Sequence, residues 1–177
     1  MTPANNLKRE FGQERFFKRL LVAVDSSAQA SFAVEEATRL ADQLGADVVL
    51  VHVFSVAFVS SPESIYLAED IRKNCVVAGD ALLTKTKQRM SHVSRVQMVL
   101  AEGDPADEIL KVAAQYEADL IVMGTHARGR IAQAVIGSVA RNVTKHARCP
   151  VLTVAHPRLD NRANKPIDVE NHASVTA

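Results

Sequence analysis

The amino-acid sequence predicts an α/β domain, a parallel sheet of five strands with helices on both faces. Three observations lead to this fold class. Short apolar runs alternate with segments whose apolar residues recur at helical spacing. Residues 48–54 are apolar on both faces, as in a central parallel strand. Helix start and stop signals separate the two kinds of segment.

The first strand and helix are predicted from a run of about 25 residues. Residues 19–24 are an apolar run that ends at Asp25. Ser26 or Ser27 then caps a helix, and Gly45 ends it. The apolar positions of this helix have helical spacing: Ala30, Val34, Ala37, Ala41 and Leu44.

The middle of the chain contributes the next two strands. Residues 48–54 are the second strand. Residues 62–92 read as a longer, less regular helical segment that contains Gly79. Residues 95–101 alternate between apolar and polar side chains, which is typical of an edge strand.

The last third repeats the alternation twice. Asp104 as a cap and Pro105 in the first helical position predict a helix start. Residues 120–123 form the fourth strand, 137–147 a helix and 150–155 the last strand.

We expect the strand order 3-2-1-4-5, and if the sheet has this order, the first and fourth strands are neighbours and their ends lie together. In such sheets, ligands bind beyond the carboxyl ends of the strands, where the winding reverses. Asp25 and Gly124 then face one crevice. The backbone N–H groups of the loop after Gly124 and of the helix start at Gly137-Ser138 also point to the same place, which predicts an anion-binding site.

Length and composition limit the class of protein. The 177 residues indicate one domain at 17–156, an N-terminal tail at 1–16 and a C-terminal tail at 157–177 that we expect to be disordered. A net charge of +1 favours neither nucleic acid nor an anionic membrane as a partner. Two distant cysteines and the lack of a signal peptide or membrane span predict a cytoplasmic protein.

Four motifs, in this order, resemble the universal stress protein family over residues 17–156. They are Val24-Asp25-Ser26-Ser27, His52-Val53, Gly103-Asp104-Pro105, and Gly124-Thr125-His126 followed by Gly137-Ser138-Val139. The resemblance implies a Rossmann-like fold related to adenine nucleotide α-hydrolases and a role in stress survival. It also implies a homodimer, commonly formed through the last strand, here residues 150–155. Some members of the family bind ATP.

The ATP-binding members carry the pattern Gly-x2-Gly-x9-Gly-(Ser/Thr). Here Gly124, Gly137 and Ser138 match it, and Ala127 stands at the second glycine. The resemblance implies that Asp25 lies at the ribose–adenine end and that the Val53 backbone meets the adenine edge. The full implied nucleotide site is Ala23, Val24, Asp25, Val53, Met123, Gly124, Ala127, Gly129, Gly137, Ser138 and Val139.

Two functions remain open. The first is a regulator that binds ATP, with Mg²⁺ held mostly by phosphates and water. The second is the same fold and dimer without nucleotide, acting on an unknown protein partner. Ala127 motivates the second, because alanine in a left-handed conformation costs ~1 kcal/mol and its methyl group can block the phosphate path. Arg128 and Arg130 favour the first, since they can neutralise phosphate charge.

Several of these residues also have plain structural interpretations. Gly124 can belong to an ordinary strand–helix turn, and Asp25 can simply cap a helix. His52 is more typical of a buried structural residue than of a ligand. His146 and Cys149 have a spacing that, without further ligands, does not predict a metal site.

The sequence predicts a binding protein rather than an enzyme. It contains no phosphate-binding P-loop, no nucleophile elbow and no evident acid–base pair of carboxylates. Any ATPase activity should therefore be weak. An enzyme that acts on adenylylated substrates rests on fold analogy alone.

Overall fold

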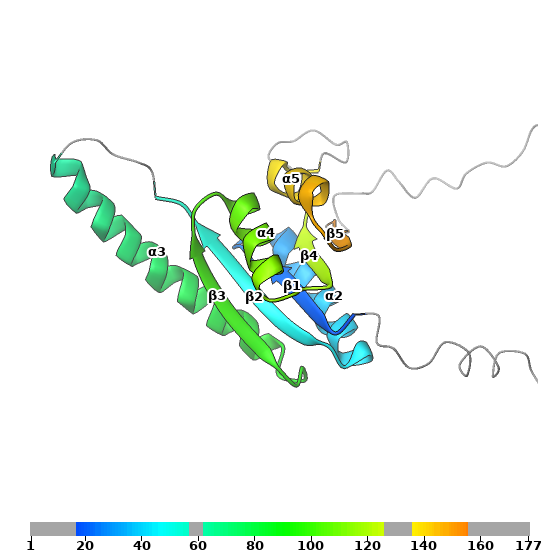
Figure 1. The fold of residues 1–177 in the computed structure, drawn as a ribbon. Coiled ribbons are helices and arrows are strands. Elements are labelled where there is room, and N and C mark those ends of the chain that lie inside the picture. Colours follow the sequence, from blue (N-terminus) through cyan, green and yellow to red (C-terminus); the bar gives the residue numbers. More distant parts are fainter. Residues whose placement is uncertain (1–16, 57–61, 126–135, 156–177) are drawn as a thin grey trace, which may run out of the picture.

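The five strands form one parallel sheet in the order β3-β2-β1-β4-β5, which confirms the predicted order (Figure 1). The computed structural model describes residues 17–56, 62–125 and 136–155. Strands and helices alternate along the chain as β1 (Arg19–Ala23), α2 (Ala28–Leu44), β2 (Asp47–Phe54), α3 (Pro62–Arg89), β3 (Val96–Glu102), α4 (Pro105–Gln115), β4 (Leu120–Gly124), α5 (Ser138–His146) and β5 (Val151–Val154).

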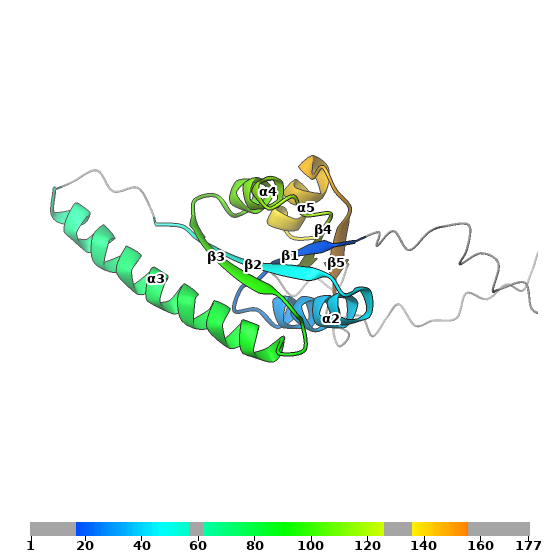
Figure 2. The same ribbon diagram turned by 60° about the horizontal axis from the view of Figure 1, so that its bottom comes forward.

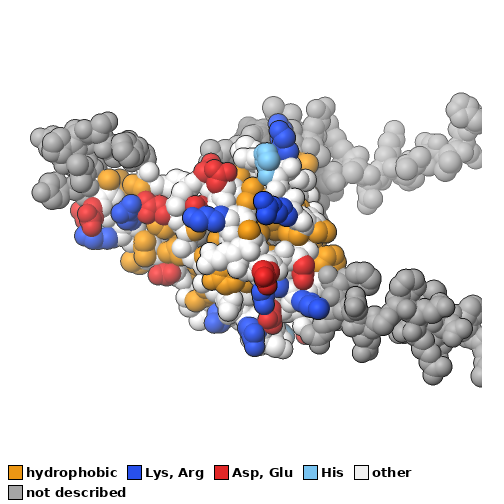
Figure 3. Space-filling model, viewed as in Figure 1, with side chains coloured by type: hydrophobic (Ala, Val, Ile, Leu, Met, Phe, Trp, Pro, Cys, Tyr) orange, Lys and Arg blue, Asp and Glu red, His pale blue; other side chains and the backbone are white. Residues whose placement is uncertain are grey.

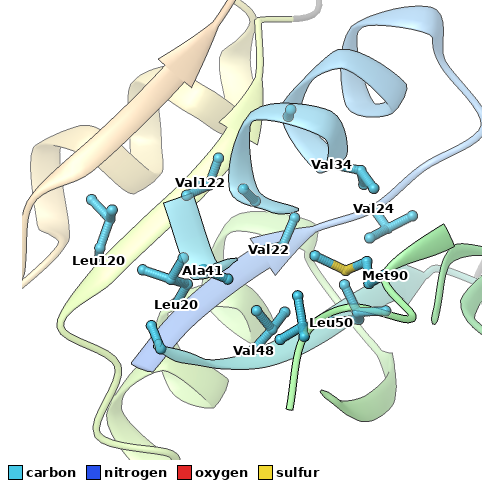
Figure 4. Packing of buried hydrophobic residues seen from close by; sticks show 14 of the residues in the cluster. Leu20, Val22, Val24, Val34, Ala41, Val48, Leu50, Met90, Leu120 and Val122 are labelled. Atoms are coloured by element: carbon cyan, nitrogen blue, oxygen red, sulfur yellow. The ribbon is translucent and has the colours of Figure 1, made fainter. Parts of the chain in front are cut away.

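Helices cover both faces of the sheet, α2 and α3 on one and α4 and α5 on the other (Figure 2). Successive residues of β1 alternate between the layers: Leu20 and Val22 pack with α2 and α3, and Leu21 packs with α4 and α5. All three are fully buried, so the middle of β1 is apolar on both faces, as in a central parallel strand. Figure 4 shows the first of these layers, in which Val34 and Met90 face the strands.

The predicted helix signals are confirmed by hydrogen bonds. The Ser27 Oγ accepts from the Ala30 N–H at 3.1 Å and caps α2. Gly45 ends α2 in the left-handed region, with φ of 61°, which glycine adopts at little cost. The Asp104 carboxylate accepts from the N–H of Ala106 at 2.9 Å and caps α4.

Helix α3 packs closely on the sheet at Gly79. A Cβ at this position would lie 2.5 Å from the Leu100 Cδ1 and 3.0 Å from the His52 Cδ2. The glycine inside this helix therefore allows close packing against β2 and β3, and a side chain there would have to displace the end of the Leu100 side chain. The helix ends at Arg89 and not at residue 92, because the chain turns there and buries Met90 against the strands. Its other end extends past the sheet (Figure 1).

The outer surface is mixed in charge. Acidic and basic side chains are interspersed on the face seen in Figure 3. Exposed ion pairs such as Arg72–Glu102, at 2.8 Å, join α3 to the end of β3. Over the described ranges, the structure contains no helix that is both long and apolar enough to span a membrane.

Candidate functional site

A crevice of about 740 Å³ opens at the carboxyl ends of β1 and β4. Its volume is in the range of small-molecule sites. Every residue of the predicted nucleotide site that lies in the described part of the chain lines this crevice. These are Ala23, Val24, Asp25, Val53, Met123, Gly124, Gly137, Ser138 and Val139. The other two, Ala127 and Gly129, lie outside the described residues.

Asp25 lies between the end of β1 and the start of α2, and its carboxylate is exposed. The Asp25 Oδ1 accepts from the Ser27 N–H at 2.8 Å and so shapes the turn before the helix. The side-chain cap of α2 is Ser27 and not Asp25, so the sequence-based alternative of Asp25 as the helix cap is wrong. One oxygen of Asp25 is thus used locally, and the side chain still lines the crevice.

Gly124 ends β4 at the floor of the crevice and has a packing role of its own. A Cβ on it would lie 2.7 Å from the backbone carbonyl carbon of Gln29 and 2.8 Å from the backbone nitrogen of Ala30. Real Cβ atoms are not found so close to backbone atoms, so only glycine lets the first turn of α2 rest on the end of this strand. The glycine is therefore explained by helix packing, whether or not a ligand binds.

Three helix N-termini line the crevice, and they differ in how their free amides are satisfied. Helix α2 is capped by Ser27, and α4 is capped by Asp104. Helix α5 begins at Gly137, which has no side chain to cap it. No described residue therefore caps the first amides of α5, and the helix dipole adds partial positive charge there.

Acidic residues strengthen this difference between the helices. The first turn of α4 contains Asp107 and Glu108, whereas the first turn of α5 contains no acidic residue. An anion is therefore favoured at the start of α5 and disfavoured at the start of α4. Among the three helix ends, the start of α5 thus has the described surroundings that best suit an anion.

The structure adds lining residues that the sequence reasoning missed. They are Ser26, Ser27, Ala30, Val51, Pro105, Ile109, Ile136, Ala140 and Arg141. Pro105 and Ile109 give the crevice an apolar wall from α4. Pro105 begins α4 shortly after the carboxyl end of β3, so the rule that ligands bind at carboxyl ends was a usable signal for it. Arg141 comes three residues after Ser138, which places it on the same side of α5.

The histidines have local structural partners. The His52 Nδ1 lies 2.8 Å from the Val24 carbonyl oxygen, so the half-buried ring links β2 to the end of β1, as the structural interpretation predicted. The His146 Nδ1 lies 3.0 Å from the Asn142 carbonyl oxygen within α5. In the part of the chain that the structure describes, no group of three or more potential ligands could hold a metal ion.

Both cysteines are free and half-buried. Burial raises the pKa of the Cys149 thiol, and the negative charge of Asp119 raises it further. The thiol is therefore largely protonated at neutral pH, which makes it a poor nucleophile.

Comparison with known proteins identifies the family of this chain. A model of the universal stress protein family matches residues 16–155. The chain belongs to the universal stress protein family. A universal stress protein of Methanocaldococcus jannaschii is 33% identical over 149 residues, which cover 82% of this chain and 86% of the relative.

Solved structures of the family share the fold. The universal stress protein UspA from Lactobacillus plantarum superposes with a TM-score of 0.71 at 24% identity, covering 78% of this chain and 97% of its own. A universal stress protein from Archaeoglobus fulgidus, solved in complex with dAMP, has a TM-score of 0.54 at 24% identity, covering 78% of this chain and 98% of its own. A further universal stress protein, solved in complex with cAMP, has a TM-score of 0.58 at 23% identity, and the match covers 78% of this chain and 97% of that protein's chain.

Proposed function

We propose that this universal stress protein is a regulator that binds an adenine nucleotide, with ATP as the first candidate, in the crevice between β1 and β4. One observation carries the proposal. The uncapped N-terminus of α5 and the carboxylate of Asp25 line a single cavity with apolar walls. Such a cavity offers a different partner to each part of a nucleotide. The nucleotide complexes of the two family members agree with it.

The lining groups suit the parts of the ligand. The amides of Ser138 and Val139 and the Ser138 hydroxyl would donate to a phosphate. Asp25 would accept a hydrogen bond from a ribose hydroxyl. Val53 and Ile109 offer apolar surface to the base.

Magnesium fits the site as a companion of the phosphates. Asp25 is the one carboxylate among the described residues that line the crevice. A Mg²⁺ ion would therefore take most of its oxygen ligands from phosphates and water, as it commonly does. The protein would contribute mainly the hydrogen-bond donors that bind the phosphates.

We propose that this site binds the nucleotide and does not hydrolyse it. A hydrolase needs a group that activates water, and the Asp25 Oδ1 is already used by the Ser27 N–H. Phosphate release from Mg·ATP, measured beside a buffer blank, tests this point. Steady release that exceeds the blank and scales with protein concentration would identify an ATPase.

The second candidate function is the same fold and dimer without nucleotide, acting on another protein. It is motivated by Ala127 in place of the family's second glycine. Mass spectrometry of the supernatant of denatured protein separates the two candidates, together with calorimetric titration with Mg·ATP. Copurified adenine nucleotide or binding heat supports the first. The absence of both at high micromolar protein supports the second.

We also propose a homodimer through β5, located in the cytoplasm. Strand β5 lies at an edge of the sheet, and its Leu152 is 36% exposed. An apolar edge strand is a template for pairing with another chain. The two free cysteines suit a reducing compartment.

A further inference from the structure

Arg141 lines the crevice, and its side chain has no hydrogen bond or ion pair with another residue that the structure describes. Its side chain is exposed and lines the cavity. Within the described ranges, five of the seven arginines hydrogen-bond or pair with another residue; they are Arg19, Arg39, Arg72, Arg89 and Arg95. Arg141 and Arg148 do not, and Arg148 is not part of this crevice. No described residue therefore occupies the guanidinium of Arg141, which is available to a ligand as far as the described ranges go.

The position of Arg141 complements the uncapped start of α5. Arg141 comes one helical turn after Gly137, on the side of α5 that contributes Ser138 to the same cavity. The first turn of α5 holds no acidic residue that would compete for the guanidinium. Asp25, the other ionised lining residue among those described, comes from a different element. The crevice therefore has a positive side at α5.

A single phosphate group is enough to engage the first amides of α5. Further phosphates of the same ligand must extend beyond these amides, and each adds negative charge that needs another partner. A guanidinium suits this role, because its planar fork donates two parallel hydrogen bonds to phosphate oxygens. The long arginine side chain also reaches beyond the turn from which it projects.

We propose that Arg141 sets the phosphate preference of the crevice, so that nucleoside di- and triphosphates bind more tightly than monophosphates. This inference rests on the proposed nucleotide-binding function. Arg141 contacts the phosphates beyond the one held by the amides of α5. The residue acts on ligand affinity and has no part in the packing of the fold, because its side chain is exposed.

The test is calorimetric titration with AMP, ADP and ATP at fixed salt and Mg²⁺. It compares the wild-type protein with Arg141→Gln, Arg141→Lys and Lys145→Gln. Lys145 is a matched control, since it is an exposed cation one turn further along α5 and does not line the crevice. Thermal melts of all variants confirm that each protein is folded.

We expect Arg141→Gln to weaken ATP binding about tenfold and AMP binding less than twofold, the scale of one charged hydrogen bond to phosphate. Arg141→Lys should retain part of the preference, and Lys145→Gln should change it little. Equal losses for AMP and ATP, or the same loss in Lys145→Gln, would overturn the inference and leave nucleotide binding intact. A wild-type protein that binds none of the three nucleotides would overturn both.

Discussion

Gly124 at the end of β4 lies directly against Gln29 in the first turn of α2. A Cβ at position 124 would stand 2.7 Å from the carbonyl carbon of Gln29 and 2.9 Å from its carbonyl oxygen. This contact joins one wall of the crevice to the end of a central strand. A side chain at position 124 would have to displace backbone, which is far less adaptable than the tip of a side chain.

Gly124→Ala should therefore destabilise the protein by about 1–3 kcal/mol, the usual cost of overpacking. Urea unfolding followed by circular dichroism measures the change. Gly137→Ala is the matched control. The φ of −58° at Gly137 is open to alanine, so we expect a loss of at most about 1 kcal/mol there. A Gly124→Ala protein as stable as the wild type would contradict the packing role.

Asp25→Asn should separate the charge of Asp25 from its role in the turn. The amide oxygen can still accept from the Ser27 N–H, so stability should stay within about 0.5 kcal/mol of wild type. ATP affinity should fall about tenfold, because the charged acceptor for the ribose is lost. Ser27→Ala is the comparison, and loss of the helix cap should lower its stability by about 1 kcal/mol. Unchanged affinity in Asp25→Asn would remove Asp25 from the proposed site.

Ala127→Gly tests the departure from the family pattern. If the methyl group obstructs the phosphates, the substitution should raise nucleotide affinity, because a glycine allows close backbone approach. Titration with Mg·ATP beside the wild type measures the difference. Equal affinities would show that the register of the loop, and not the methyl group, decides binding.

Leu152→Glu should convert the proposed dimer into a monomer. A charge on edge strand β5 opposes pairing with a second chain. Sedimentation at micromolar concentration reports the mass. Met98→Glu is the control at the opposite edge, since Met98 on β3 is 42% exposed, close to the 36% of Leu152. A wild-type monomer, or loss of the dimer in Met98→Glu, would contradict an interface at β5.

Cys149 should react slowly with iodoacetamide, because burial and then Asp119 raise the pKa of its thiol. In a Cys75→Ser background, the alkylation rate should climb with pH through a midpoint above that of a free thiol, about 8.5. The pKa of Cys149 is higher in the folded than in the unfolded protein. Its stabilising contribution to the free energy of unfolding is therefore present below the unfolded pKa and is lost as pH rises through the folded pKa. Unfolding in urea should restore the ordinary midpoint. A folded protein with an ordinary midpoint would contradict the assignment.

The sequence was a good guide wherever a structure depends on neighbouring residues. The caps at Ser27 and Asp104 and the stop at Gly45 follow from short-range hydrogen bonding and backbone conformation. The end of α3 was harder to predict, because residues 90–92 continue a helical pattern. The helix stops at Arg89 since burial of Met90 in the core turns the chain.

By itself, the sequence determined the alternation of strands and helices, which depends on local periodicity. With the family resemblance, it also predicted the strand order and a group of residues at the ends of the first and fourth strands. Only the tertiary structure decided that Gly124 serves the packing of α2, that Pro105 and Ile109 wall the crevice, and that α5 alone among the three helices lining it starts without a side-chain cap. Such relations join segments far apart in the chain, and the distances between them are set by the packing of the whole domain.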